Sequence, residues 1–494
     1  MIGAPGRQCA NPRQIGSDLS RDGNSLNNLA CERGRCDNRI SSLYLQTSRP
    51  TIARKDTMTF VSAITRARRL SRLFHDVRAQ TGSSVAALTY LGRFVAKKLP
   101  IVYRQFRSVV QYRAAGGRMA AISNRPDSQR PYLAFKVTGG LGDCLVIARF
   151  LRDLAAQSGG FDFDIYATQP AQAHWAFRSV EGLRDCHEAA VFDVAHTNYD
   201  LAGRINQFLT FEADSAVWHR LQSRPALVQA ARGAIRFRPK IEPFIQNHPY
   251  MDGYLAQRAV YANRGRRDFL HAITDTQYGG DRLDLAVPEG IAQRHGLARG
   301  RYITIHNGFD PNFFTTKATA TKCYPHFGAV VALLRKKWPE LRFVQIGVGT
   351  SQKLPEVDLD LLNQTSMQDA AGLIRDALLH IDNEGGLVHL ARCLGVNSCV
   401  VFGPTPSNYF GYAGNINIDP AFCGGCWWNN ETWMDQCPRG YPAARCMAEQ
   451  PPQAVAGAID RYLIASFADR PATAHAPQSA SPAQPQPVGA VSSG

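Results

Sequence analysis

The stretch LLHIDNEGGLVHLARCLGVNSCVVFG, residues 378–403, decides the fold class. It predicts a buried strand over 378–383, a helix that ends on Gly395, and a second strand over 397–403. A strand, a helix and a strand in this order are typical of a parallel sheet with helices packed on its faces. We therefore expect an α/β protein.

The same alternation occurs in two parts of the chain. Further strands are predicted at 132–138, 161–168, 302–307 and 342–349, and further helices at 143–157, 327–341 and 366–377. The last of these helices opens with Ser366 and Asp369, a capping pair. Residues 131–299 and 300–465 are thus predicted to form two doubly wound, Rossmann-like domains that face each other across a cleft.

The remaining segments have a different composition. Residues 1–57 are rich in Arg, Asn, Ser and Gly, and residues 466–494 in Pro, Ala and Ser, so both are predicted to be disordered. Residues 58–130 are predicted to be a basic helical extension, and Met58 is an alternative start. The N-terminus lacks the apolar core of a signal peptide, and this places the protein in the cytoplasm.

The net charge of +16 belongs to the N-terminal extension. Residues 1–130 carry 23 Lys and Arg against 7 Asp and Glu, whereas residues 131–494 carry 33 of each. A neutral body with a basic arm is not the charge layout of a general nucleic-acid binder, so no nucleic acid partner is expected. The helices at 60–80 and 85–113 form either a solvated hairpin packed on the body or a basic amphipathic surface for peripheral contact with the inner membrane.

The loop KVTGGLGDCL, residues 136–145, carries the first group of candidate site residues. Gly140 and Gly142 lie between a strand and a helix, where backbone N–H groups can approach a ligand. Asp143 at the helix start is either a general base toward a hydroxyl nucleophile or a helix-capping aspartate. The loop lacks the spacing of a dinucleotide fingerprint, so nicotinamide or flavin binding is not supported.

Two loops of the second domain carry further candidates. Lys322 in TATKCYP (319–325) is either a phosphate partner or a solvated charge. Gly385 and Gly386 expose N–H groups at a helix start, which suits a diphosphate. Glu384 could accept hydrogen bonds from sugar hydroxyls, and His389, one turn later, faces either the ligand or the core.

Four cysteines lie in 24 residues with the spacing C-x2-C-x10-C-x8-C; they are Cys423, Cys426, Cys437 and Cys446. In a reducing cytoplasm this spacing favours a closed, structural site with four thiolates around Zn²⁺ or iron, although two disulfides or free thiols are the alternative. The tryptophans Trp427, Trp428 and Trp433 are expected to pack around the metal, or to face an acceptor or a partner subunit.

The motifs GGLGD, TKCYP and NEGGLVHLARCLG…VVFGPT, in this order over 131–465, resemble those of the ADP-heptose-dependent heptosyltransferases, glycosyltransferase family 9. The resemblance implies a GT-B fold and inverting heptose transfer. It also implies that Asp143 is the catalytic base and that Lys322 and the loop 384–389 hold the donor. The family usually has Asn-Asp-Thr-Gly where this chain has Asn383-Glu384-Gly385-Gly386. The cysteine segment 423–446 resembles the iron-binding finger of bacterial autotransporter heptosyltransferases.

The expected function is therefore transfer of heptose from ADP-heptose to a hydroxyl of a protein or lipopolysaccharide acceptor, with a structural iron or zinc ion. A homo-oligomer is compatible with this expectation. The alternatives are a GT-B transferase for another nucleotide sugar and a non-catalytic GT-B protein that binds a glycan or protein partner.

Overall fold

The computed structural model describes residues 54–117, 130–212 and 217–468. Residues 64–494 form one compact unit that contains both sheets, and of residues 1–63 only the start of α2 (Arg54–Thr81) is described. The disorder predicted for 1–57 and 466–494 thus falls almost wholly outside the described residues. The few exceptions, 54–57 and 466–468, are helical, because α2 and α19 (Pro452–Ala468) extend past the predicted boundaries.

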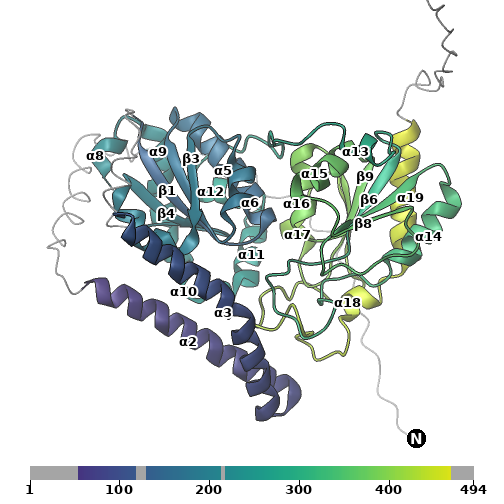
Figure 1. The fold of residues 1–494 in the computed structure, drawn as a ribbon, viewed down its shortest axis with the longest axis horizontal. Coiled ribbons are helices and arrows are strands. Elements are labelled where there is room, and N and C mark those ends of the chain that lie inside the picture. The colour runs from purple at the N-terminus through teal and green to yellow at the C-terminus, as the bar shows by residue number, and fades with distance from the viewer. Residues whose placement is uncertain (1–53, 118–129, 213–216, 469–494) are drawn as a thin grey trace, which may run out of the picture. The chain divides into compact units, whose positions relative to one another are not determined.

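The first sheet has five strands in the order β3-β2-β1-β4-β5 (Figure 1). They are β1 (Tyr132–Val137), β2 (Asp162–Ala167), β3 (Leu183–Glu188), β4 (Leu201–Ile205) and β5 (Leu209–Phe211). Strands β1 to β4 pair in parallel, and β5 runs antiparallel to β4. The order reverses between β1 and β4, which makes the loops after these two strands the switch point of the sheet.

The second sheet has six parallel strands in the order β11-β10-β9-β6-β7-β8. They are β6 (Tyr302–Ile305), β7 (Arg342–Gly347), β8 (Leu359–Leu362), β9 (Leu379–Asn383), β10 (Ser398–Val401) and β11 (Ile416–Ile418). This is the strand order of a Rossmann domain, with its switch point between β6 and β9. The predicted fold class, α/β with two doubly wound domains, is confirmed.

Helices cover the sheets and contribute the core. The helices that flank the strands are α5 (Leu141–Ser158), α6 (Pro170–Phe177), α9 (Pro225–Phe237), α14 (Phe327–Lys337), α15 (Met367–Asp376) and α16 (Gly386–Leu394). Buried side chains of α5, α6 and α9 pack on one face of the first sheet, in the same core cluster as α15 and α16 on the second sheet. A separate cluster joins α14 and α19 to the opposite face of the second sheet.

Further helices and 3₁₀ turns, most of them short, form the connections. They are η1 (Ala189–Val191), α7 (Phe192–Ala195), η2 (His196–Asn198), α8 (Trp218–Leu221), η4 (Arg238–Lys240), α10 (Glu242–Asn247), α11 (Asp252–Tyr261), α12 (Phe269–Thr274), α13 (Ile291–Arg294), α17 (Ser407–Phe410) and α18 (Arg445–Ala448). Many of them lie between 189 and 300, the helical, irregular stretch between the two α/β runs, where no individual helix was predicted.

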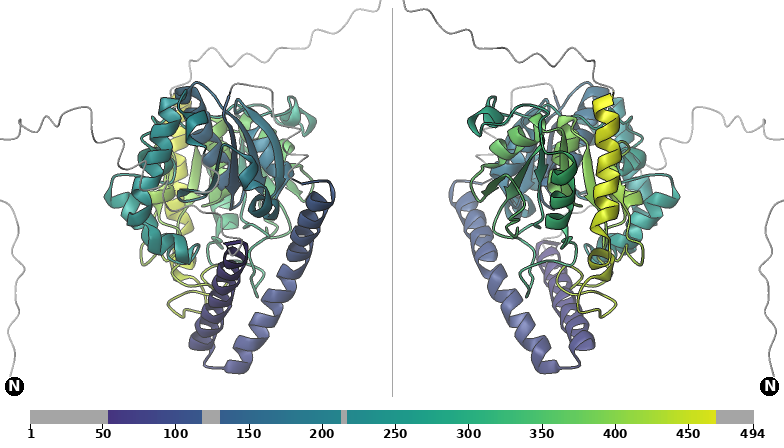
Figure 2. Two further views of the ribbon diagram at one scale, coloured as in Figure 1. Left: turned by 90° about the vertical axis from the view of Figure 1, so that its left-hand side faces the viewer. Right: turned by 90° about the vertical axis from the view of Figure 1, so that its right-hand side faces the viewer.

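The N-terminal helices were predicted close to their observed positions. After α2, Gly82 at φ 68° makes the turn, and Ser83 caps α3 (Ser84–Ala114) by accepting a hydrogen bond from the Ala86 N–H at 3.2 Å. Figure 2 shows the turn between the two helices. Among the described residues no helix combines the length and apolarity that crossing a bilayer requires.

Helix α3 is attached to both halves of the unit. Lys97 and Lys98 donate to the carbonyls of Phe313 and Asn312, in the loop that follows β6. Arg104 donates to the Thr168 carbonyl at 3.0 Å, next to the end of β2, and pairs with Glu188 at 3.3 Å.

Candidate active site

The N-terminus of α5, which packs on the first sheet, meets the N-terminus of α16, which packs on the second sheet. A Cβ atom built on Gly142 of α5 would lie 2.5 Å from Cδ2 of His389 and 3.3 Å from Cα of Gly386, so only glycine permits this approach. Both helices direct their unpaired N–H groups and positive dipole ends toward this point. The predicted residues Gly140, Gly142 and Gly386 thus share one location, which suits an anion such as a diphosphate.

Asp143 lies at this point with both carboxylate oxygens engaged. Its Oδ2 accepts a hydrogen bond from the Gly140 N–H at 3.1 Å, so the capping role left open by the sequence is present. Its Oδ1 accepts from Nη2 of Arg266 at 2.8 Å. The side chain is 26% exposed, and a substrate hydroxyl can therefore still reach it.

Arg266 is a site residue that sequence reasoning missed. Its side chain is 2% exposed, and its Nη1 is buried with no hydrogen-bond partner among the described residues. It comes from the connection 262–268 before α12, which carries no recognisable motif, and it meets Asp143 across 123 positions of sequence. The guanidinium fixes the orientation of the carboxylate.

The predicted donor residues of the second domain form a linked chain. Nζ of Lys322 lies 3.4 Å from Oε2 of Glu384, and Oε1 of Glu384 lies 3.8 Å from Nε2 of His389. Gly385 joins Glu384 to the helix in extended backbone at φ −179°, which any residue can adopt. The Asn383 side-chain oxygen accepts from the Tyr324 N–H at 2.7 Å and so positions the loop that carries Lys322.

His389 is buried and neutral. Burial, followed by the nearby cations Arg149, Arg266 and Lys322, holds the pKa of its imidazole well below the ordinary value of 6.5. Its Nδ1 lies 2.6 Å from the Tyr412 hydroxyl, which also accepts from Arg149 at 2.8 Å.

The proton on this imidazole can be placed from its partners. Arginine can only donate, so the proton of the Tyr412 hydroxyl is free to bond Nδ1 of His389. A neutral imidazole that accepts at Nδ1 carries its proton on Nε2, which faces Glu384. The hydrogen bond of His389 is to the buried Tyr412 hydroxyl, and the contact of Nε2 with a ligand stays a prediction.

Arg149 and Tyr412 were also missed as members of this network. Arg149 had a signal, since it is a single cation on the apolar side of the helix 143–157. Tyr412 lies in the loop that follows β10 and returns over the same sheet edge.

A second histidine, His306, follows β6 at the switch point of the second sheet. Its Nδ1 lies 2.8 Å from Oδ1 of Asp382 in β9. Burial would raise the pKa of the Asp382 carboxyl, but the imidazoles of His306 and His380 lower it overall. The Asp382 side chain is therefore held in place by His306 beneath this edge of the sheet.

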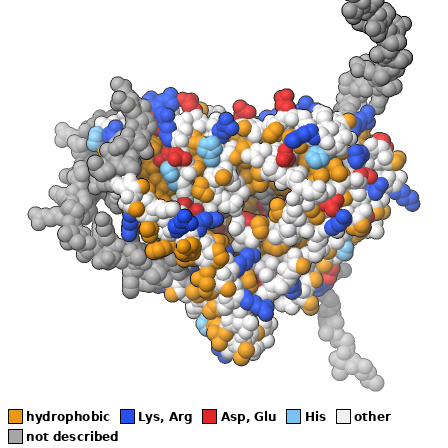
Figure 3. All heavy atoms as spheres, viewed as in Figure 1, with side chains coloured by type: hydrophobic (Ala, Val, Ile, Leu, Met, Phe, Trp, Pro, Cys, Tyr) orange, Lys and Arg blue, Asp and Glu red, His pale blue; other side chains and the backbone are white. Residues whose placement is uncertain are grey.

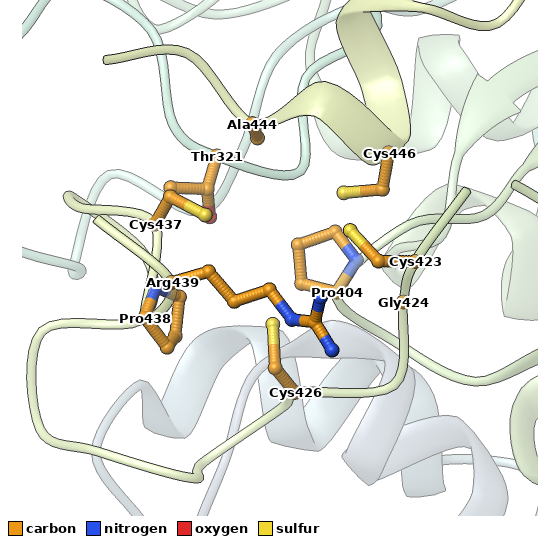
Figure 4. A pocket seen from close by; sticks show the side chains of 10 residues that line it. All are labelled: Thr321, Pro404, Cys423, Gly424, Cys426, Cys437, Pro438, Arg439, Ala444 and Cys446. Atoms are coloured by element: carbon orange, nitrogen blue, oxygen red, sulfur yellow. The ribbon is translucent and has the colours of Figure 1, made fainter. Parts of the chain in front are cut away.

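The four finger cysteines line one cavity of about 30 Å³. Figure 4 shows Cys423 and Cys446 pointing toward each other and the Arg439 side chain reaching in beside Cys426. None of the described cysteines is in a disulfide, which removes the disulfide alternative for these four. Burial and the neighbouring thiols raise the pKa of Cys426 to about 11 and that of Cys446 to about 12.

The donor set fits a metal in type and number, but coordination is not confirmed. No group of three or more His, Cys, Asp or Glu side chains is arranged to hold a metal ion within residues 54–117, 130–212 and 217–468. The shared cavity indicates that the thiols could converge, whereas their present positions do not form a coordination shell. A four-thiolate site therefore remains a proposal.

The three tryptophans of the finger are buried in the core, and none faces solvent. Their exposed fractions are 8% for Trp427, 8% for Trp428 and 2% for Trp433. Trp427 packs edge-on against Phe410 of α17, and Trp428 and Trp433 contact Phe313. The expectation that they face an acceptor or a partner subunit is wrong, because these rings anchor the finger to the body of the protein.

No protein-family model matches the sequence, and no curated protein matches it. Among solved structures, the chain is similar to the iron-containing dodecameric glycosyltransferase TibC from enterotoxigenic Escherichia coli, with 17% identity over 69% of this chain and 80% of that one, at a TM-score of 0.44. It is also similar to E. coli ADP-heptose LPS heptosyltransferase II (14% identity, 68% and 99% coverage, TM-score 0.42) and to a family 9 glycosyl transferase of Veillonella parvula (13%, 59% and 87%, 0.36). Similarity at this level does not assign a function.

Proposed function

We propose that this chain is an inverting GT-B glycosyltransferase that moves heptose from ADP-heptose to a hydroxyl of a protein or lipopolysaccharide acceptor. One observation carries the proposal: Asp143, Lys322, Glu384 and His389, which come from two sheets, converge where the N-termini of α5 and α16 meet. These are the residues to which the motif resemblance assigns the reaction.

The proposed transfer uses these groups as follows. The acceptor hydroxyl gives its proton to Asp143 as its oxygen bonds the anomeric carbon of the sugar. The bond from that carbon to the diphosphate breaks on the opposite face, and the nucleoside diphosphate leaves with the electron pair. The α16 N-terminus and Lys322 offset the negative charge that develops on the leaving group.

Glu384 and His389 are suited to hold the sugar and the diphosphate. The Glu384 carboxylate can accept hydrogen bonds from sugar hydroxyls, and Nε2 of His389 carries a proton toward the same place. Because Lys322 lies beside Glu384, it can bridge the carboxylate and a phosphate oxygen of the donor.

We further propose that Cys423, Cys426, Cys437 and Cys446 hold a structural iron or zinc ion. Four thiolates close a tetrahedral shell and leave no position for substrate, so the ion would stabilise the finger and take no part in the transfer. Figure 4 shows that the four side chains surround a single cavity, which supports this assignment.

One observation favours the non-catalytic alternative. Both oxygens of Asp143 already accept hydrogen bonds, so a substrate hydroxyl would have to share an oxygen with the Gly140 N–H or with Arg266. On this alternative the chain binds a glycan or protein partner without catalysis.

The deciding experiment incubates the full chain with ADP-heptose, ADP-glucose, a UDP-sugar and a GDP-sugar, each with and without a serine/threonine-rich peptide or a lipopolysaccharide core. Released nucleoside diphosphate and glycosylated acceptor are measured, and donor binding is measured by calorimetry. We expect turnover with ADP-heptose only. Turnover with another donor would overturn the heptose assignment, and the absence of turnover with every donor would favour the non-catalytic alternative.

A further inference from the structure

Helix α3 exposes a continuous apolar stripe. Eight large apolar side chains of this helix are between 38% and 73% exposed; they are Val85, Leu88, Val95, Leu99, Val102, Tyr103, Phe106 and Val110. Their spacing of three and four residues places them along one side of the helix, since successive residues turn by about 100°. We call these eight residues the α3 stripe.

The opposite side of α3 is the one that packs on the protein. Ala87 and Tyr90 are buried there, and Tyr90 and Phe94 meet Phe314 edge-on. The stripe is therefore not the docking face of the helix, and it stays uncovered by any part of the chain that the structure describes. From Val85 to Val110 it extends about 38 Å at the rise of an α-helix.

The charge of α3 has a single sign. The helix contains six Lys and Arg and no Asp or Glu. Lys97, Lys98 and Arg104 are used in contacts with the protein, whereas Arg107 and Arg113 are exposed three or four residues from Tyr103 or Val110 of the stripe. Figure 3 shows hydrophobic side chains gathered along this helix with Lys and Arg beside them.

The exposed apolar side chains and the single sign of charge together indicate which kind of partner fits the α3 stripe. A second copy of the helix packed on the stripe would bring like charges together without the acidic partners that helix pairs use at such positions. An anionic bilayer surface accepts both features, because the apolar side chains enter the acyl boundary while the cations meet lipid head groups. We propose that the α3 stripe docks the protein on the surface of an anionic membrane.

The test measures binding of the full chain to sedimented vesicles of phosphatidylcholine, with and without 30% phosphatidylglycerol. We expect binding to the anionic vesicles that decreases at high salt. Leu99→Asp combined with Phe106→Asp should lower the partition coefficient at least tenfold. Arg107→Gln combined with Arg113→Gln should lower it about 25-fold, since each cation near the surface contributes about fivefold.

Tyr261→Asp is the matched control, because Tyr261 is 89% exposed in α11, outside the stripe, and this change should leave binding unaltered. Unchanged circular dichroism and melting temperature show that the stripe variants fold. Equal binding by the native protein and the stripe variants overturns the proposal. So does a native oligomer that the Leu99 and Phe106 changes dissociate in the absence of vesicles, since a second copy would then be the occupant.

Discussion

Asp143 combines two roles that are usually given to different residues. Its Oδ2 helps to start α5 by accepting from Gly140, and its Oδ1 pairs with Arg266 at the surface where the substrate would approach. Both hydrogen bonds hold the carboxylate in one orientation. As the proposed base, Asp143 would already be oriented and would therefore lose less freedom in the transition state.

Asp143→Asn should lower kcat by about 10²–10⁴-fold, because the amide cannot take a proton from the acceptor hydroxyl. Donor affinity should change little, since the amide oxygen can still accept from the Gly140 N–H. Steady-state kinetics and calorimetry on the purified variant check both expectations. Turnover within threefold of the native enzyme would exclude Asp143 as the base.

His389 should make stability depend on pH. Its pKa is lowered in the folded protein, so between 6.5 and that lower value the unfolded chain binds a proton that the folded chain does not. The free energy of unfolding should therefore fall as pH decreases below 6.5. Denaturant titrations at pH 7.5, 6.5 and 5.5 should show a smaller decrease for His389→Gln. Parallel curves for the two proteins would mean that His389 is not neutral in the fold.

The site could be predicted from sequence only where its residues belong to local motifs. Lys322 and Glu384 lie in loops between a strand and a helix, and Asp143 lies in the first turn of α5, directly after such a loop. These segments can be recognised from neighbouring residues. Arg266 and Tyr412 lie in irregular segments. Arg266 joins the site through Asp143, 123 positions away, and Tyr412 joins it through His389, 23 positions away. No periodicity or spacing rule reports such contacts.

At the scale of elements, helix ends were predictable because their signals are local. Ser366 caps α15 and pairs with Asp369, and Gly395 ends α16 in the left-handed region at φ 79°. Strand β3 was missed because its sequence LRDCHE is polar and half-exposed at the sheet edge, so it lacks a buried apolar run. The sheet order also could not be read from sequence, since it depends on which strands pair over long distances.

The finger is held by two different means, which predicts how it responds to mutation. Its tryptophans are buried against Phe313 and Phe410, while its acidic residue Glu431 pairs with Arg69 and Arg72 of α2. These contacts lie outside the cysteine cavity. The loop should therefore remain attached when a single thiol is lost, although its tip would become less stable.

Replacing any one finger cysteine by serine should lower both metal content and melting temperature, because metal binding contributes directly to folding. Elemental analysis of protein purified without a histidine tag should give one iron or zinc per native chain. Occupancy should fall at lower pH, since the metal must displace protons from thiols whose pKa is raised. Cys186→Ser, a change outside the finger, is the control. A native protein that is metal-free and fully stable would contradict the proposed site.

At the scale of the whole molecule, the contact between α5 and α16 fixes how closely the sheets approach. Gly142→Ala should destabilise the protein by about 1–3 kcal/mol, because the added Cβ meets the His389 ring. Gly92→Ala is the matched change in open space within α3 and should stabilise by about 0.5–1 kcal/mol. Opposite shifts in denaturant midpoint are expected. A stabilising shift for both would mean that the two helix starts are not in contact in solution.

The attachments of α3 have a mechanical consequence. Lys97 and Lys98 attach the helix to the loop after β6, and Arg104 attaches it to the end of β2. Pro100 lies between these two attachment points. Because proline has no backbone N–H, one hydrogen bond of the helix is missing there, and this section bends more easily than its neighbours. A rotation of one sheet relative to the other would therefore bend α3, and the bend would be largest at Pro100.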